Sequence, residues 1–329
     1  MMMSRFRAFV LGPLAFVGVL TSHAALADSI ITVDVPGSTS TTLNGINDTG
    51  VAVGSYDASF ATHAFIRQPD GTISTFDVAG AVSTYGQGIN NAGLVTGYYD
   101  IGGAYVGYLR ATDGTITSFT VPLALSTQGF GINNLGQIVG TYSLSGSLDF
   151  HGFIRSADGS SFTTFDAPGA VWTYAQGIND SGVVSGFYFD GAAFHGYLRA
   201  TDGSFTTYDV VASPFSAGTF GNGINDLGTT VGYVLDPVFD SSGPLFTATG
   251  FVRQSDGTYQ LFPIPPSYLV YAMDINNSNQ IVGQYVVDGV THGFITQAVP
   301  EPGAYAMLAT GVSLLSLASS VRRRLSCRS

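Results

Sequence analysis

The sequence predicts an all-β fold, a six-bladed β-propeller with four strands in each blade. The first observation is a Gly-Ile-Asn or Asp-Ile-Asn motif that recurs with its isoleucine at six positions: Ile46, Ile89, Ile132, Ile178, Ile224 and Ile275. The intervals are 43, 43, 46, 46 and 51 residues, and periods of this length indicate a propeller or a solenoid. The second observation is that each unit divides into four short apolar segments, as in TYAQGIND, VVSGFYF, FHGYLRA and SFTTYDV of the fourth unit.

An Asp-Gly dipeptide separates the third and fourth segments in five units. Asp-Gly between two alternating apolar runs is a strong hairpin signal, because a tight reversed turn needs residues that tolerate a positive φ. We therefore expect such turns at Asp70, Asp113, Asp158, Asp202 and Asp256.

The last unit lacks a fourth segment, and the chain carries a matching one before the first unit. IITVDVPGS, residues 30–38, resembles STFDVAGA and TTFDAPGA of the later repeats. An N-terminal strand that completes the last blade would close the ring and remove its open edges. The alternative, a linear β-solenoid, would leave this strand without a partner.

The two ends predict export. Residues 1–27 have the pattern of a signal peptide, with Arg5 and Arg7 before an apolar run and a cleavage site of small residues at Ala25 and Ala27. An uncleaved anchor is the alternative. Residues 28–298 would form the propeller and residues 299–329 a C-terminal segment.

That segment has three parts in order. Pro300, Glu301 and Pro302 precede the uncharged residues 303–321, which as a helix would span about 28 Å, and Arg322, Arg323 and Arg324 follow. The arginines should stay in the cytoplasm and leave the body outside, at the cell surface or in the extracellular space.

This three-part order resembles the PEP-CTERM sorting signal of exported bacterial proteins. The resemblance covers about 30 residues and implies recognition of Pro300, Glu301 and Pro302 by an exosortase-type membrane protease, which would remove or exchange the tail. An ordinary C-terminal anchor is the alternative.

The body is also similar to the HAF-repeat family of bacterial extracellular proteins. The similarity rests on HAFIR, HGFIR, HGYLR and HGFIT at His63, His151, His195 and His292. Two units depart from the pattern, with Val106 and Thr249 in place of the histidine. The resemblance implies export and a repeat fold, and no known catalytic residues.

Charge and cysteine content exclude several classes of function. Lysine is absent, and between Asp28 and Glu301 the sequence has 22 acidic residues against five arginines, a balance of 22 − 5 = 17 negative charges. Nucleic-acid binding is therefore excluded, since it needs a basic surface. The single cysteine, Cys327, lies in the tail, which excludes disulfides and thiolate chemistry in the body.

Three repeated polar positions suggest sites but have simpler interpretations. The four histidines suggest a metal, yet equivalent positions on different blades point apart, so we favour local packing or a hydrogen bond. The third-segment arginines suggest anion binding, but ion pairs with the turn aspartates or with Asp77, Asp166 and Asp209 are simpler. Asn47, Asn179 and Asn225 suggest calcium loops, but the four-residue turns supply too few ligands. The third-segment arginines are Arg67, Arg110, Arg155, Arg199 and Arg253. No metal and no cofactor is predicted.

Candidate functional residues lie where the repeats differ. Catalytic motifs are absent, and Glu301 is the only glutamate between the two ends. Two kinds of connection differ in length and content between units: those from the second to the third segment, and those from the fourth segment to the first segment of the next unit. Aromatic, amide and acidic side chains in these connections could bind a sugar or a protein. The candidates are Trp172, Tyr174, Gln176, Tyr85, Tyr271, Asp100, Asp190 and Asp236. Of these, Gln176 is expected to face the central channel.

The sequence thus favours an exported, non-catalytic surface protein that binds a polysaccharide or a protein of the extracellular matrix. A polysaccharide hydrolase or lyase using Asp190 or Asp236 is one alternative. A purely structural surface protein is another, and packing between blades is the competing interpretation of the aromatic residues.

Overall fold

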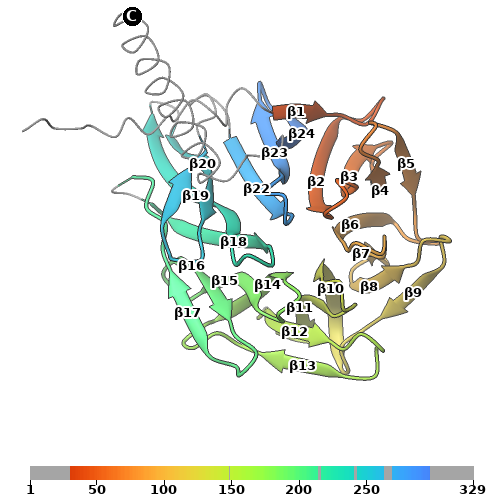
Figure 1. The fold of residues 1–329 in the computed structure, drawn as a ribbon, viewed down its shortest axis with the longest axis horizontal. Coiled ribbons are helices and arrows are strands. Elements are labelled where there is room, and N and C mark those ends of the chain that lie inside the picture. Colours follow the sequence, from red (N-terminus) through yellow and green to blue (C-terminus); the bar gives the residue numbers. More distant parts are fainter. Residues whose placement is uncertain (1–29, 148, 214–215, 241–242, 263–268, 297–329) are drawn as a thin grey trace, which may run out of the picture.

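The computed structural model describes residues 30–147, 149–213, 216–240, 243–262 and 269–296. Every regular element in these ranges is a β-strand, and there are 24 of them. The strands form antiparallel sheets that stand around a central axis in chain order, as the colour sequence of Figure 1 shows. This arrangement is that of a β-propeller, so the all-β prediction is confirmed.

Four of the sheets have four strands each and one has eight. The first comprises β2 (Ser40–Ile46), β3 (Ala52–Ala58), β4 (Ala61–Arg67) and β5 (Ile73–Phe76). The second comprises β6 (Ser83–Ile89), β7 (Val95–Asp100), β8 (Tyr105–Arg110) and β9 (Ile116–Phe119). The third comprises β10 (Ala124–Ile132), β11 (Ile138–Leu144), β12 (His151–Arg155) and β13 (Phe162–Phe165).

The eight-stranded sheet follows. It contains β14 (Trp172–Ile178), β15 (Val184–Phe189), β16 (Phe194–Arg199), β17 (Phe205–Tyr208), β18 (Gly218–Ile224), β19 (Thr230–Asp240), β20 (Gly243–Arg253) and β21 (Tyr259–Leu261). Its two halves, β14–β17 and β18–β21, are joined by one parallel pair, Phe194 with Gly218.

The last sheet joins the two ends of the described chain. It contains β22 (Leu269–Ile275), β23 (Ile281–Val287), β24 (Val290–Thr296) and β1 (Ile30–Val33). Strand β1 pairs antiparallel with β24, from Ile30 opposite Thr296 to Val33 opposite Gly293. Strand exchange therefore completes this sheet as the sequence predicts, and the linear solenoid is excluded.

The core lies between neighbouring sheets. One cluster joins Val53 and Ile66 of the first sheet to Ile89, Val95 and Tyr108 of the second. The third strand of each unit carries a fully buried aromatic ring, and a glycine of the second strand lies under it. At Gly54 a Cβ would come within 3.0 Å of the Phe65 ring, so only glycine lets the ring pack flat against the strand. These rings belong to Phe65, Tyr108, Phe153, Tyr197, Phe251 and Phe294.

The Asp-Gly turns differ in type from the expected reversed turn. In the Asp70–Gly71 turn of the first sheet only the glycine has a positive φ, 92°. The Gly71 amide donates to the Gln68 carbonyl, and the Gln68 amide donates to the Thr72 carbonyl. This is a three-residue loop closed by a left-handed glycine. Asp70 keeps a negative φ because its carboxylate accepts the Thr72 amide, which stabilises an ordinary type I bend.

Several expectations concern residues outside the described ranges. They are the signal peptide with Ala25 and Ala27, the motif Pro300 to Pro302, and the span that ends at Arg322, Arg323 and Arg324. Within the described ranges, no helix has the length and apolar character needed to cross a bilayer.

Candidate functional site

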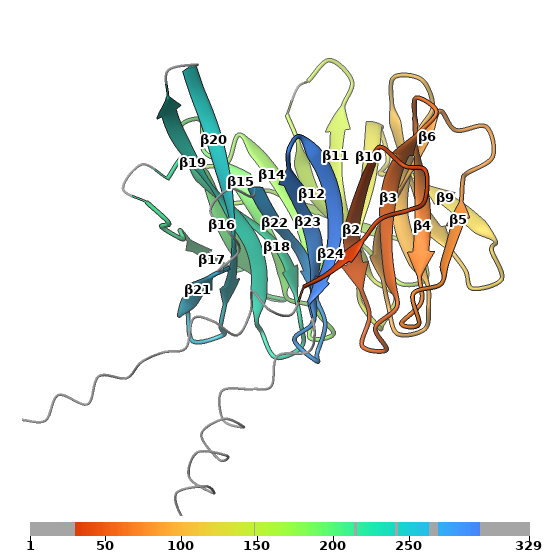
Figure 2. The same ribbon diagram turned by 90° about the horizontal axis from the view of Figure 1, so that it is seen from above.

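The propeller has two unlike faces, visible edge-on in Figure 2. Turns from first to second and from third to fourth strands define the hairpin face. Connections from second to third strands and from each fourth strand onward define the variable-loop face. All the candidate residues except Gln176 lie in strands or loops near the variable-loop face, so the two faces have to be compared.

A closed ring of hydrogen bonds encircles the axis at the hairpin face. The asparagine after each motif isoleucine donates from its side-chain amide to the backbone carbonyl of its counterpart in the next unit, over 2.9–3.2 Å. The last bond runs from Asn276 to Asn47 and closes the circle. All six side chains are buried, and each carboxamide oxygen also accepts amides of its own turn, as Asn179 does from Val183. The six are Asn47, Asn90, Asn133, Asn179, Asn225 and Asn276.

A second ring lies one residue further along. Each backbone amide donates to the side-chain oxygen of the next unit over 2.7–2.9 Å, again in a closed circle. Its members are Asp48, Asn91, Asn134, Asp180, Asp226 and Asn277. The Asn-Asp turns that resembled calcium loops therefore use their oxygens to connect neighbouring units. Among the described residues no group of three or more His, Cys, Asp or Glu could hold a metal ion.

The central channel is narrow. Five side chains at bulges of the first strands line it: Asn44, Gln87, Phe130, Gln176 and Met273. They leave about 80 Å³, the room of a few water molecules at roughly 30 Å³ each. Gln176 lies among the residues that line this channel.

One ionisable group stands out along the channel. Asp274 replaces the glycine found at this position of the other five units, and its carboxylate accepts the Ile46 amide over 3.0 Å. The bond joins the last sheet to the first. Enclosure by protein raises the pKa of Asp274 to about 7, against the lowering effect of its backbone hydrogen bonds, and Asp48 raises it further.

Three of the aromatic candidates belong to packed clusters. Trp172 stacks on Phe189 with ring centroids 4.9 Å apart, and Tyr174 stacks on Phe187 at 4.7 Å. Tyr271 meets Tyr233 edge-on at 4.8 Å. All three candidates are half-buried, and burial raises the pKa of Tyr174 to about 12. The structure therefore gives these residues a packing role and leaves only part of each ring accessible.

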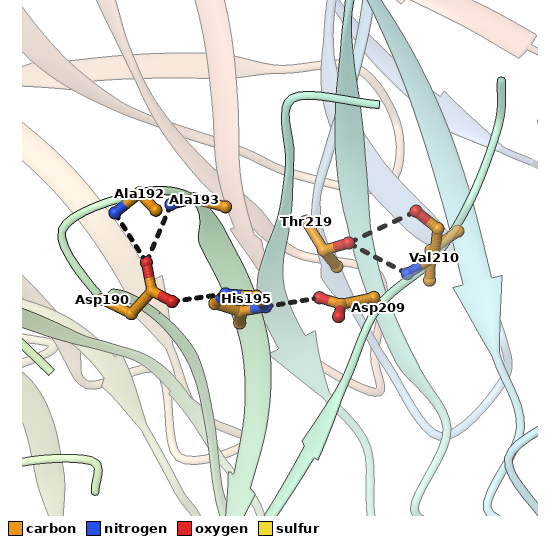
Figure 3. Close-up of polar contacts among 7 residues, drawn as sticks. All are labelled: Asp190, Ala192, Ala193, His195, Asp209, Val210 and Thr219. Carbon is orange, nitrogen blue, oxygen red and sulfur yellow. Dashed lines mark hydrogen bonds and ion pairs between the residues drawn. The ribbon is translucent and has the colours of Figure 1, made fainter. Parts of the chain in front are cut away.

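Asp190 and His195 lie in a chain of polar contacts that Figure 3 shows. His195 Nδ1 is 2.8 Å from Asp209, and its Nε2 is 3.4 Å from Asp190. Asp190 also accepts the Ala192 and Ala193 amides, and these bonds, with the proximity of His195, lower its pKa. Asp190 thus shapes its own loop.

The His195 arrangement is mostly repeated. Each HAF-type histidine lies against a tyrosine ring of the second strand and contacts an aspartate that follows the fourth strand, over 2.8–3.1 Å. In the last sheet, His292 of β24 contacts Asp34, which follows β1. The structural interpretation of the histidines therefore holds, and Asp190 is an addition to a repeated pair. The pairs are His63–Asp77, His151–Asp166, His195–Asp209 and His292–Asp34.

The expected arginine ion pairs are wrong. Asp77, Asp166 and Asp209 contact histidines, and among the described residues no arginine lies within 4.0 Å of a carboxylate oxygen. Four guanidinium groups instead lie over aromatic rings of the preceding unit's fourth strand, 4.7–5.1 Å from the ring centroid, and attraction to the ring replaces the ion pair. These contacts are Arg110–Phe76, Arg155–Phe119, Arg199–Phe165 and Arg253–Tyr208.

The two remaining acidic candidates also organise loops. Asp100 accepts the Gly102 and Gly103 amides. Asp236 is 7% exposed and accepts the hydroxyls of Ser213 and Ser216. The acidic candidates therefore lie in separate units. Asp100 and Asp190 bind the loops that follow them, and Asp236 of β19 binds the connection between β17 and β18.

Tyr85 lines a hollow on the variable-loop face. The hollow has a volume of about 540 Å³, within the usual range of ligand pockets. Its walls come from the β3–β4 hairpin and the starts of β2 and β6, and include Asp57, Phe60 and Thr62. Sequence reasoning missed Phe60, whose relative exposure of 111% is the highest among the large exposed apolar side chains. The sequence did contain a signal: Ser59 and Phe60 occupy the positions at which the last unit has Asp288 and Gly289.

The comparisons with known proteins support the fold. No family model and no curated sequence matches the chain. A protein described as TolB from Agrobacterium tumefaciens matches with a TM-score of 0.52 at 15% identity, over 78% of this chain and 89% of that one. Virginiamycin B lyase from Staphylococcus aureus scores 0.46 at 11% identity, over 82% and 99%, and Trypanosoma rangeli sialidase 0.43 at 11%, over 88% and 58%. At 15% identity the first match supports the fold alone. It does not assign the chain to a family.

Proposed function

We propose that this chain is an exported, six-bladed β-propeller that binds an extracellular polysaccharide or protein through its variable-loop face, without catalysis. The blade count takes β14–β17 and β18–β21 as two blades, because a single residue pair joins these halves. With the four four-stranded sheets this gives six.

One observation carries the binding role: the variable-loop face holds large apolar side chains in solvent. Phe60, Ile101, Leu123 and Phe246 are 111%, 55%, 93% and 55% exposed. Phe60, Ile101 and Leu123 come from different connections and Phe246 from the first part of β20, so the apolar surface extends over several units. Apolar surface on loops of a rigid scaffold is a common feature of binding sites.

Export rests on the sequence of the two ends. We assign residues 1–27 as signal peptide and 299–329 as a PEP-CTERM-type sorting signal recognised by an exosortase-type protease, with the C-terminal helix as an at least transient membrane anchor. The described chain ends at Thr296, whose hydroxyl accepts the Ile281 amide beside the hairpin face. An anchor after Thr296 would direct the variable-loop face away from the membrane.

The test uses the full chain in a detergent without a sugar headgroup. It is presented to immobilised extracellular polysaccharides and to cell-surface protein fractions. Ile101→Ser and Phe246→Ser alter the variable-loop face, and Leu135→Ser and Leu227→Ser, with 62% and 52% exposure at the hairpin face, are the matched controls. We expect the first pair to weaken binding and the second to leave it unchanged. Equal effects of both pairs, or no binding, would contradict the proposal.

Processing is tested separately. Terminal sequencing and mass measurement of the protein recovered from cells should show a start at Asp28 and loss of the tail near Pro302. An intact chain at either end would overturn that part of the proposal.

A further inference from the structure

The β3–β4 hairpin has an unusual turn. Ser59 and Phe60 join paired residues Ala58 and Ala61, and their φ angles are 51° and 67°. Two positive values in a two-residue loop define a reversed turn, which favours Asn-Gly or Asp-Gly. For a bulky residue the left-handed region costs about 1–2 kcal/mol.

The same turn occurs elsewhere with the preferred residues. Asp288 and Gly289 join Val287 to Val290 at the equivalent place of the last sheet, with φ of 51° and 77°. The first sheet therefore has phenylalanine where glycine would form the turn more easily. Its side chain gains no burial in return, since it is fully exposed. This combination indicates a role for the Phe60 ring outside the fold, because strained residues gather at functional sites.

The hollow beside Phe60 combines aromatic and hydroxyl-bearing walls. Tyr85 is held in place by stacking on Tyr98 at 4.6 Å and by an edge contact with Tyr105 at 6.4 Å. The Asp57 carboxylate is exposed and accepts the Thr62 hydroxyl through one oxygen over 2.7 Å. Thr39, Ser59 and Ser83 add hydroxyl groups. Aromatic faces accept the C–H face of a sugar ring, and a carboxylate accepts its hydroxyls.

Charge narrows the ligand class. The lining of the hollow has one carboxylate, Asp57, and no arginine or histidine. The body around it carries 22 acidic residues against five arginines between Asp28 and Glu301. An acidic polysaccharide would be repelled, whereas a neutral one would not.

We propose that the hollow formed by Asp57, Phe60, Thr62 and Tyr85 binds a neutral polysaccharide, with Phe60 and Tyr85 contacting the sugar rings and Asp57 accepting their hydroxyls. This assignment rests on the proposed binding function of the variable-loop face and names its ligand class and one of its sites.

The experiment separates binding from stability at one residue. In the full chain, Phe60→Gly supplies the residue that the turn prefers, so the melting temperature should stay the same or rise. Affinity for a short neutral glucan oligosaccharide should fall about tenfold or more, the scale of losing an aromatic contact at a binding site. Phe60→Trp keeps an aromatic face and should retain affinity within about threefold.

Asp288→Gly is the matched control. Asp288 also has a positive φ, 51°, and is exposed in the equivalent turn of the last sheet, but it does not line the hollow. This variant should likewise not lower the melting temperature, and it should leave the oligosaccharide affinity unchanged. Polygalacturonate oligosaccharides, as the acidic probe, should bind at least about tenfold more weakly than the neutral glucan.

Three outcomes would overturn the assignment: unchanged affinity in Phe60→Gly, equal losses in Asp288→Gly, or tighter binding of the acidic probe. If full-length polysaccharide or surface protein still binds in a way that Ile101→Ser weakens, the hollow is wrong and the binding face stands. If nothing binds the wild-type chain, the proposed function itself fails.

Discussion

The two faces of the propeller differ in how strictly the sequence repeats. At the hairpin face all six units contribute equivalent residues to two closed hydrogen-bond rings. At the variable-loop face the connections differ in length and content, from the two-residue turn at Ser59 to the four residues, Ile101 to Ala104, between β7 and β8. A position that must contact its counterpart in the next unit cannot vary alone, whereas a loop that faces solvent can.

The difference separates residues that hold the ring together from residues that can serve a ligand. The hairpin face pairs its polar side chains with one another, so its carboxylates already have partners. Both faces leave apolar side chains in solvent, but those of the variable-loop face lie where the repeats differ, whereas Leu135 and Leu227 of the hairpin face lie in turns of uniform length. Four predictions test this division, in order of expected effect.

The largest effect should come from opening the inner ring. Asn276→Ala removes the donors to the Asn47 carbonyl and to Gln280 and the acceptor for two turn amides, all at a buried position. Leaving these groups without partners should lower the free energy of unfolding by about 3 kcal/mol. Urea unfolding followed by circular dichroism measures this. A loss below about 0.5 kcal/mol, the level of an ordinary surface substitution, would refute the importance of the ring.

Asp274 should make the junction of first and last sheets sensitive to pH. The folded state holds the Asp274 proton more tightly than the unfolded chain, with a pKa of about 7 against 3.8. The free energy of unfolding should therefore fall as pH rises from about 4 to about 7 and then level off. Asp274→Asn should remove this fall and stabilise the protein on the order of 2 kcal/mol at pH 8, with little change at pH 4.

Urea unfolding of both proteins at pH 4 and pH 8 tests this second prediction. A difference between them that is the same at both pH values would show that the Asp274 carboxyl keeps its usual pKa in the fold.

The third prediction compares one contact in two places. His63–Asp77 lies within one sheet, while His292–Asp34 connects β24 to the end of β1. Each histidine→Ala change should cost about 1 kcal/mol. Only His292→Ala should speed amide hydrogen exchange in β1, because β1 is held at the edge by this contact and by pairing with β24. Equal exchange in β1 for both variants would contradict a special role at the closure.

The smallest effect is expected at the variable-loop face. Leu123→Gly removes a left-handed leucine and a solvent-exposed side chain, so the free energy of unfolding should rise by about 0.5 kcal/mol. Thermal unfolding measures it. A loss of more than about 1 kcal/mol would show that this loop packs more than its exposure indicates.

Much of the fold follows from the repeat. The period, the four segments and the unmatched N-terminal strand predict the sheets and the pairing of β1 with β24, because each depends on local pattern and on the need to close the ring. The structural interpretation of the histidines and of Asn179 also follows from repetition.

Contacts across long intervals could not be predicted in the same way. The sequence predicts arginine partners for aspartates such as Asp77, but histidines contact them instead. The reason is that the third strand of one unit packs on the fourth strand of the preceding unit. This packing places Arg110 over the Phe76 ring, and Asp77 contacts His63. The turn type at Asp70 depends on where the pairing of β4 and β5 stops. Both are set by register between elements.

The sequence alone determined the repeat, the strand-rich character, the acidic body and the ends that predict export, since these depend on composition and spacing. Only the tertiary structure showed that the six asparagines form one circle, that Trp172 and Tyr174 are packed, and that Phe60 stands in solvent at a strained turn. Burial and hydrogen-bond closure depend on residues 40 or more positions apart, and these are brought together only when the ring closes.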